Sequence, residues 1–251
     1  MVETATIAAY LDGFLHIHEV PDSAGALNGL QVANEGRIRR IAAAVDASER
    51  AIEEASRRGC DLLLVHHGLF WDGNRPVVGR RYRKLKRLMD GGIAVYAAHI
   101  PLDAHPEVGN NAVLARELGI ELEGTFGDYK GTKIGVHGRL DLLREGLAAR
   151  MHDLLGTPVR FVPGGPEKLQ RVGVITGAGS DAIGEAIALG LDALVTGEGP
   201  HHSYFEAMEG GINLYYGGHW ATETWGVRAL AEHLEKRFGL PWEFLELPTG
   251  F

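Results

Sequence analysis

The sequence predicts an α/β protein made of two duplicated three-layer units with largely parallel or mixed sheets. Three observations support this prediction: an internal repeat, an alternation of apolar runs with helical segments, and glycines where the expected helices end. A chain of 251 residues can form one large domain or two domains of roughly 100 to 150 residues each. The repeat favours two domains.

Two pairs of segments are repeated along the chain. The segment AIEEASRRGCDLLLV (51–65) matches AIGEAIALGLDALVT (182–196) at a constant offset of 131 residues, and MDGGIAVYAA (89–98) matches MEGGINLYYG (208–217) at an offset of 119. The difference means that the first half carries 12 extra residues, which we expect in the loop 68–80. Internal similarity of this kind indicates a duplicated supersecondary unit.

Each half reads as strand, helix, strand, helix, strand, helix. Such alternation is typical of a parallel sheet covered by helices. The second and third strands of the first half are nearly continuous apolar runs, which predicts burial on both faces. Gly59 and Gly190 are expected as left-handed residues that end helices. The expected segments are 40–46, 48–58, 61–65, 81–90, 93–98 and 108–118, then 171–176, 180–189, 192–196, 203–209, 212–217 and 222–237.

The second unit is expected to open with YKGTKIGVHGRLD (129–141), which reads as a strand and a turn. We therefore expect a first α/β repeat over residues 1–127 and a second over residues 128–251. The C-terminal helix and strand are expected to pack back on the first repeat.

The composition limits the partners and the compartment. A formal net charge of -8 argues against nucleic-acid binding, which needs clustered cations, and the one basic run (80–87) is interpreted as a solvated helix face. The single cysteine, Cys60, lies in an apolar setting that predicts an inert thiol in a reducing compartment. The start of the chain does not read as a signal peptide, and no apolar run approaches the ~20 residues that span a bilayer. A cytoplasmic protein is expected.

Metal-binding residue types follow the second and third strands of both halves. In open α/β sheets, ligands bind beyond the carboxyl ends of the strands. If the two repeats face each other, these strand ends converge. The residues are His66, His67, Asp103, Glu198, His219 and Glu223.

This mixture of imidazoles and carboxylates suits divalent iron, zinc, manganese, cobalt or nickel, whereas calcium prefers oxygen ligands. The adjacent His66 and His67 point in opposite directions in extended chain and serve two ions more readily than one. His219 and Glu223 share one face at the start of a helix for which Thr222 is the expected N-cap. Each motif alone is more often a loop or capping feature. Their coincidence at repeated strand ends favours a pair of ions.

With these residues located, the chain resembles the YbgI-type dinuclear metal-centre family, also called Nif-three-like proteins or GTP cyclohydrolase 1 type 2 homologues. The resemblance covers nearly the whole chain. It rests on NGLQV (28–32), DLLLVHHGLFW (61–71), AAHIPLDAHPEVGNNAVLARELG (97–119), DALVTGE (192–198) and GGHWATETWGVRALAEHL (217–234). Many members have proline where this chain has Gly68, which implies a more flexible loop here. Longer members carry an inserted domain between the halves, which this chain lacks.

The resemblance implies five metal ligands: His66, His67, Asp103, His219 and Glu223. His67 and Asp103 would hold one ion, His66 and His219 the other, and Glu223 would bridge them. Glu198 then moves behind the ligands, where His202 and His99 are further candidates for orienting a ligand or carrying a proton. The resemblance also implies a homohexamer, a trimer of dimers.

The function expected from these observations is metal-dependent hydrolysis by activated water. The family name implies ring opening of a purine nucleotide such as GTP, and Trp71 or Trp220 is a candidate to line a pocket for a planar base. The alternative is a non-catalytic, metal-binding oligomeric scaffold, or a metal-handling or regulatory protein. The segment VITGAGSDAIGEAI (174–187) either cradles a phosphate at a helix start or uses its glycines for tight packing. No organic cofactor, nucleic acid or membrane is expected.

Overall fold

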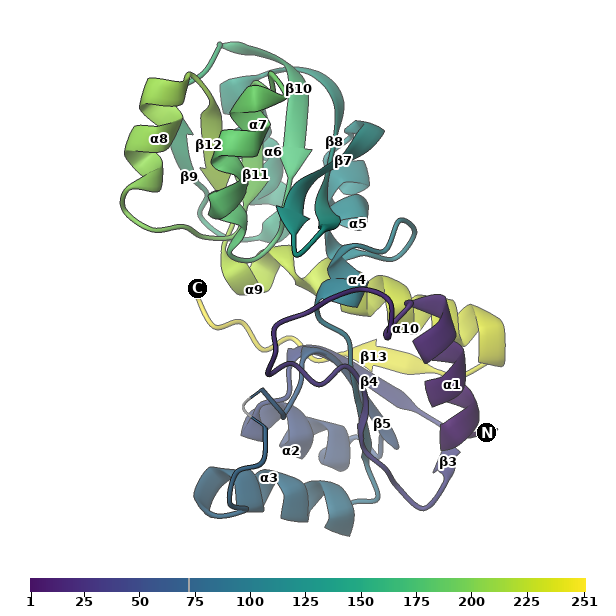
Figure 1. The fold of residues 1–251 in the computed structure, drawn as a ribbon. Coiled ribbons are helices and arrows are strands. Elements are labelled where there is room, and N and C mark those ends of the chain that lie inside the picture. Colours follow the sequence, from purple (N-terminus) through teal and green to yellow (C-terminus); the bar gives the residue numbers. More distant parts are fainter. Residues whose placement is uncertain (72) are drawn as a thin grey trace. The chain divides into compact units, whose positions relative to one another are not determined.

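The computed structural model describes residues 1–71 and 73–251, and the chain forms two compact units. The first unit consists of Met1–Leu102 and Gly226–Leu247, and the second of Asp103–Trp225 and Pro248–Phe251. Each unit contains a mixed sheet with helices packed against it (Figure 1). This confirms the predicted α/β fold class.

The sheet of the first unit has the order β13-β4-β5-β6-β2, in which only β2 runs antiparallel to its neighbour. Helices α2 (Glu49–Arg57) and α3 (Gly79–Asp90) cover one face, where Ile52 and Leu88 share a buried cluster with Leu63 of β5. Helix α1 (Thr4–Phe14) is tied to the strands by a 2.9 Å hydrogen bond from the Tyr96 hydroxyl to Asp12. The strands are β13 (Trp242–Phe244), β4 (Ile41–Asp46), β5 (Leu62–His67), β6 (Ala94–Ala97) and β2 (Gly29–Val32), and a separate pair joins β1 (Val2–Glu3) to β3 (Arg37–Ile38).

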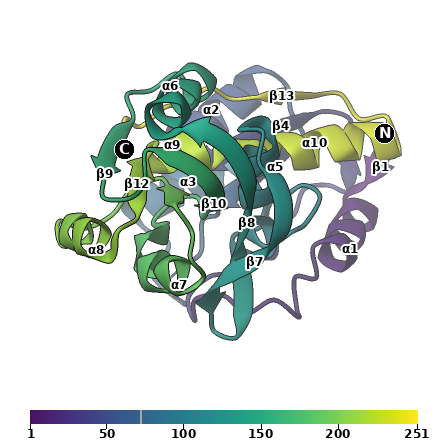
Figure 2. The ribbon, with the colours of Figure 1, turned by 90° about the horizontal axis from the view of Figure 1, so that it is seen from above.

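The sheet of the second unit has the order β7-β8-β10-β11-β12-β9, with the parallel trio β10, β11 and β12 in its middle. Leu114 and Leu147 bring helices α5 and α6 to one face, and Ala186 and Ala207 bring α7 and α8 to the other (Figure 2). The elements are α5 (Asn110–Glu117), β7 (Glu121–Tyr129), β8 (Thr132–Leu143), α6 (Arg144–Leu155), β9 (Arg160–Pro163), β10 (Lys168–Val174), the 3-10 helix η1 (Gly179–Ala182), α7 (Ile183–Ala188), β11 (Ala193–Thr196), α8 (Ser203–Gly210) and β12 (Asn213–Tyr216). Helices therefore cover both faces of this sheet.

Strand register confirms the duplication. Ile41 of β4 lies opposite Leu62 of β5, and Val172 of β10 lies opposite Ala193 of β11, so both partners are displaced by the offset of 131 residues found in the sequence. The pairing of β5 with β6 corresponds to that of β11 with β12, and here the third strands, β6 and β12, are related by the offset of 119. Two parallel trios with the same register follow from one repeated unit.

Equivalent local contacts accompany the shared register. Asp61 accepts hydrogen bonds from the backbone N–H groups of residues 39 and 40, and Asp192 accepts them from residues 170 and 171. Gly59 and Gly190 both have φ of +66°, the left-handed conformation expected where their helices end. Both copies of the repeat therefore keep an aspartate directly before the second strand of the trio and a glycine two residues before that aspartate.

Two antiparallel edge strands, β2 in the first unit and β9 in the second, were not expected from the sequence. Leu30 of β2 pairs with Tyr96 of β6, and Phe161 of β9 pairs with Tyr215 of β12, again at the two repeat offsets. No strand was expected at residues 29–32, yet Gln31 lies within β2. Both strands are only four residues long and contain no long apolar run.

The compact units differ from the halves expected at residues 1–127 and 128–251. Helix α5 packs in the second unit, where Leu114 and Leu118 share a buried cluster with Leu147. Most of helix α10 (Thr224–Phe238) and strand β13 belong to the first unit, the repeat on which the C-terminal helix and strand were expected to pack, and Trp242 pairs there with Ile41 of β4. The first boundary therefore lies at residues 102–103.

Most of the extra residues of the first half lie in a longer connection and a longer helix. The connection before α3 covers 68–78, and that before α8 covers 197–202; α3 has 12 residues and α8 has 8. The loop 68–80 therefore holds only part of the difference.

Cys60 is buried, and burial raises the pKa of its thiol to about 11, as expected for an inert cysteine. Within residues 1–71 and 73–251, no helix combines the length and hydropathy needed to cross a bilayer.

Candidate metal centre

Three histidines gather at the carboxyl ends of β5 and β6 in the first unit. His66 and His67 are the last residues of β5, and His99 follows β6. One ring nitrogen from each lies within 4.8 Å of the others. His66 is fully buried, while His67 and His99 are partly exposed. This group offers three imidazole ligands for a divalent cation.

A hydrogen bond orients each of the three rings through Nδ1. His66 Nδ1 lies 2.9 Å from the carbonyl oxygen of Ala98, and His67 Nδ1 lies 2.9 Å from a carboxylate oxygen of Asp46. His99 Nδ1 lies 2.9 Å from a carboxylate oxygen of Asp22. An Nδ1–H that donates to an oxygen makes Nε2 of a neutral imidazole the atom that accepts a metal ion or a proton. All three rings are therefore oriented to use Nε2 in one of these two ways.

The carboxylate behind His99 is held as an anion. Burial opposes ionisation of Asp22, but hydrogen bonds from His99 and Asn28 outweigh it and lower the pKa of the carboxyl from 3.8 to about 2. Asn28 donates to Asp22 at 2.8 Å, and its side-chain oxygen accepts the backbone N–H of His99 at 2.8 Å. Asn28 therefore positions both members of the pair.

The second unit brings His219 and Glu223 together. His219 begins the short helix α9 (His219–Thr222), and its Nε2 lies 3.1 Å from a carboxylate oxygen of the buried Glu223. Its Nδ1 lies 2.7 Å from Glu198, which follows β11. Glu198 thus contacts the histidine from behind, as Asp46 contacts His67. Thr222 is not the expected N-cap, because it ends α9 and its hydroxyl donates to the carbonyl oxygen of Gly218.

Hydrogen bonding to Glu223, assisted by Glu198, outweighs burial and raises the pKa of His219 to about 9. In the metal-free protein, both ring nitrogens therefore donate to carboxylates at neutral pH. A cation bound at Nε2 would take the place of that proton and would also meet the Glu223 carboxylate.

Gly177, which follows β10, makes room for this pair. Its φ is +63°, and a Cβ atom built on it would lie 2.2 Å from Glu223 Oε1 and 3.3 Å from His219 Nε2. Its N–H donates to the Thr222 hydroxyl at 3.1 Å, and its carbonyl oxygen accepts the backbone N–H of Glu198. The first glycine of VITGAGSD therefore serves tight packing, the second of the two roles considered for this segment.

Asp103 lies at the end of helix α4 (Ile100–Asp103) and is buried. Asn110 donates to its carboxylate at 2.9 Å, and Asn111 donates to its backbone oxygen at 3.2 Å. The two asparagines thus fix the carboxylate and its main chain from the start of α5. Both asparagines lie in the motif AAHIPLDAHPEVGNNAVLARELG (97–119), but no role was expected for either of them from the sequence.

The remaining candidate, His202, lies exposed at the start of α8. Its ring is 3.9 Å from Glu206, one turn along the helix. Of the three residues proposed to act behind the ligands, His99 and Glu198 have carboxylate or histidine partners near ligand positions, whereas His202 pairs on the helix surface.

The donor chemistry of both units fits divalent transition-metal ions. The first unit supplies imidazoles backed by carboxylates, and the second supplies an imidazole in contact with a buried carboxylate. Such mixed nitrogen and oxygen sets suit zinc, iron, manganese, cobalt or nickel.

Comparison with known proteins identifies the family. The model of the Duf34/NIF3 (NGG1p interacting factor 3) family matches residues 2–249. The chain belongs to the Duf34/NIF3 family. A relative from Deinococcus radiodurans named GTP cyclohydrolase 1 type 2 homolog is 47% identical over 247 residues, which cover 97% of this chain and 93% of the relative.

Solved structures agree with this Duf34/NIF3 assignment. A protein ybgI, described as of unknown function, matches with a TM-score of 0.92 and 35% identity, and the match covers 100% of each chain. TTHA1606 from Thermus thermophilus matches with a TM-score of 0.90 and 43% identity, again over 100% of each chain. The family resemblance inferred from the sequence motifs is confirmed.

Proposed function

We propose that this Duf34/NIF3 protein is a metal-dependent hydrolase that binds two divalent ions through His66, His67, Asp103, His219 and Glu223. The observation that carries the proposal is the backing of the histidines: His67 by Asp46, and His219 by Glu198. A carboxylate behind a ligand histidine fixes its orientation and raises its basicity. The buried Glu223 beside His219 supports a bridging role for its carboxylate.

When bound, the metal ions would lower the pKa of water toward neutrality and polarise the electrophile. The protein's own residues would hold these ions and move protons. Asp22 fixes Nδ1 of His99, so that Nε2 of His99 is the proposed site of proton transfer. Asn28 keeps this pair in place through its contacts with both residues.

The proposed substrate class is a purine nucleotide that undergoes hydrolytic ring opening. The name of the relatives, GTP cyclohydrolase 1 type 2 homolog, supports this class. We test it by loading the protein with each metal in turn and measuring turnover of nucleoside triphosphates, beside a Glu223→Ala variant. We expect turnover that the variant loses. Equal turnover in both proteins would contradict the proposal, and no turnover by a fully metal-loaded protein would favour the non-catalytic metal-binding scaffold or metal-handling role.

We further propose that the protein assembles with copies of itself as a hexamer in the cytoplasm. Helix α8 supports association because Tyr204, Phe205 and Met208 expose 47%, 50% and 41% of their surface. Light scattering of the wild type and of Phe205→Glu tests this directly. A wild-type mass of six chains that falls in the variant is expected, and a monomeric wild type would contradict it.

A further inference from the structure

A cavity of about 420 Å³ lies between the segment after β5 and helix α3 in the first unit. Its wall is anchored by Leu69 and Phe70, which pack against the buried cluster under α2 and α3. The backbone N–H of Leu69 donates to Gln31 at 2.6 Å, and Trp71 Nε1 donates to the carbonyl oxygen of Gly68 at 2.9 Å. The aromatic part of the wall is therefore held by the core and by hydrogen bonds.

The cavity is lined by four cations in a chain of net negative charge. Arg75, Arg80, Arg81 and Lys84 line it, and the lining residues that the structure describes include no Asp or Glu. The whole chain carries a formal charge of -8. Cations concentrated in a hollow favour the binding of an anion.

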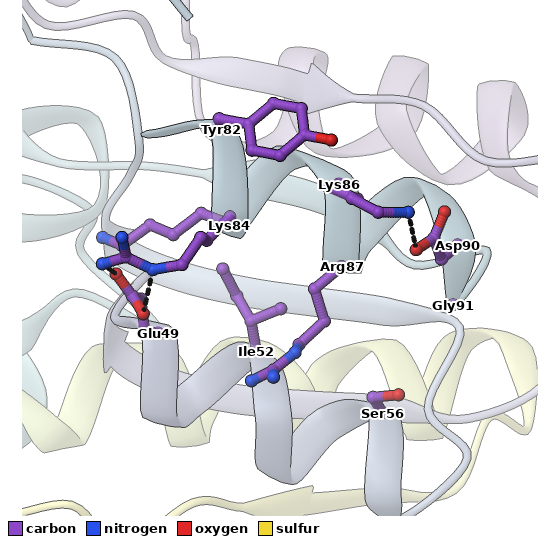
Figure 3. A pocket seen from close by; sticks show the side chains of 10 residues that line it. Glu49, Ile52, Ser56, Tyr82, Lys84, Lys86, Arg87, Asp90 and Gly91 are labelled. Atoms are coloured by element: carbon purple, nitrogen blue, oxygen red, sulfur yellow. Dashed lines mark hydrogen bonds and ion pairs between the residues drawn. The ribbon is translucent and has the colours of Figure 1, made fainter. Parts of the chain in front are cut away.

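The opposite side of α3 is different, because carboxylates neutralise its cations. Lys86 lies 2.6 Å from Asp90 (Figure 3). Arg83 lies 2.6 Å from Glu49. The interpretation of the basic run as a solvated helix face fits this side. It does not fit the side that faces the cavity.

On the cavity side, Arg81 and Lys84 contact carbonyl oxygens and an aromatic ring. Arg81 donates from Nη1 to the carbonyl oxygen of Arg75 at 3.0 Å and lies 5.1 Å from the centre of the Phe70 ring, while its Nε is buried and has no hydrogen-bond partner among the described residues. Lys84, which also lines the pocket on the opposite side of α3, donates to the carbonyl oxygen of Ala47 at 2.7 Å. Burial, and then the nearby Arg80, lower the pKa of Lys84 and outweigh the opposite effect of Glu49 and Asp46. A bound anion would offset the repulsion between Lys84 and Arg80 and the cost of burying the Lys84 charge.

Trp71 links the cavity to the histidines. Its ring meets His99 edge-on at 5.0 Å and His67 at 5.9 Å between ring centres. Gly68, another lining residue, directly follows His67 in the chain. A molecule whose anionic end occupies the cavity can therefore present a planar part along Trp71 toward the histidine cluster.

We propose that this cavity binds the phosphate groups of a planar, phosphorylated substrate of the nucleotide class, with Arg81 as the main contact and Trp71 beside the ring. The role as a substrate site rests on the proposed function, whereas the anion binding does not. Arg81 suits this role because a guanidinium can donate two parallel hydrogen bonds to a phosphate.

Calorimetry on the metal-free, full-length protein tests the proposal with GTP and inorganic triphosphate as probes. We expect both probes to bind the wild type, and Arg81→Gln to weaken both at least about tenfold. Arg83→Gln is the matched control from the carboxylate-paired side of α3, and we expect less than about a twofold change. Trp71→Leu should weaken GTP more than triphosphate, because only GTP has a ring. Circular dichroism establishes that each variant is folded.

Failure of the wild type to bind either probe would overturn the proposal, as would equal losses in folded Arg81→Gln and Arg83→Gln. Metal content and turnover, measured on the same preparations, separate this result from the proposed function. Metal uptake and hydrolysis without probe binding would contradict only the proposal that the cavity binds phosphate. Probe binding without metal uptake would support the cavity as an anion site and contradict the proposed metal-dependent hydrolase.

Discussion

Asp46 and Gly177 occupy equivalent positions at the carboxyl end of the first strand of each parallel trio, because they are separated by the repeat offset of 131 residues. In the first unit, the Asp46 carboxylate orients His67. In the second, the missing side chain of Gly177 leaves space for Glu223. The duplication thus kept the strand ends as positions for polar chemistry, while one copy came to support a ligand from behind and the other to make room for one.

The equivalent helices α3 and α8 differ just as clearly. Helix α3 carries three of the four cations that line the proposed phosphate cavity, whereas α8 exposes Tyr204, Phe205 and Met208. A cationic helix suits a small anion, and an apolar helix face suits another protein surface. The two copies therefore present chemically different surfaces from equivalent helices.

The largest expected effect follows from removing one ligand in either unit. We expect His66→Ala and Glu223→Ala each to reduce metal affinity by more than about 100-fold, because even residues behind ligands change affinity about 10- to 100-fold. Titration calorimetry of apo protein with Zn²⁺ or Mn²⁺ measures this. Exposed His202→Ala is the control and should bind normally. If either ligand variant keeps wild-type affinity for two ions, the assignment of that unit is wrong.

A smaller loss is expected from the carboxylates behind the histidines. Asp46→Asn and Glu198→Gln should each weaken metal binding about 10- to 100-fold, because the amide removes the charge that raises histidine basicity. Glu206→Gln serves as the control, since Glu206 pairs with His202 on the surface of α8. Unchanged metal affinity in Asp46→Asn would show that the contact of Asp46 with His67 does not affect metal binding.

The space beside Glu223 can be filled directly. Gly177→Ala should lower the free energy of unfolding by about 1 to 3 kcal/mol, because Gly177 has a positive φ and the new Cβ meets the Glu223 carboxylate. Gly184→Ala in α7 is the matched control: no atom lies within 4 Å of its added Cβ, and alanine favours the helix by about 0.5 to 1 kcal/mol. Urea unfolding of metal-free protein compares them. Equal stability of the two variants would contradict the packing role.

The smallest effect concerns the repeated carboxylates Asp61 and Asp192. Burial opposes ionisation of Asp61, but the Arg39 side chain and backbone N–H groups outweigh it and lower its pKa from 3.8. A depressed pKa stabilises the fold above pH 3.8, and this contribution is lost as the pH falls through the lower folded value.

Asp61→Asn should therefore cost about 1 kcal/mol at pH 7, after allowance for solvent screening of the exposed Arg39, and less below about pH 4. Asp192→Asn should cost less at pH 7, because Asp192 accepts the backbone bonds without the equivalent arginine contact among the described hydrogen bonds. Chemical unfolding across this pH range measures both. A loss in Asp61→Asn that does not change with pH would contradict the electrostatic explanation.

The parallel trios could be predicted because two constant offsets and apolar strands are local signals. The packing of α5 in the second unit could not, since it depends on the tertiary contact of Leu114 with the cluster that contains Leu147. The short edge strands β2 and β9 carry too few apolar residues to be recognised.

At the site, the expectation that ligands bind at the carboxyl ends of strands identified His66 and His219 as candidate metal ligands. The same expectation would have identified Asp46, which ends β4, as a candidate. Asp22 gave no such signal, because it lies in an irregular segment 77 residues from His99. The fit of Gly177 beside Glu223 likewise depends on contacts between distant parts of the chain.

The metal content of the purified protein tests the central claim most directly. Elemental analysis, repeated after chelation and reloading, should find two divalent transition-metal ions per chain in the wild type and fewer in Glu223→Ala. Native protein without such an ion, together with apo protein that takes up none, would contradict the account.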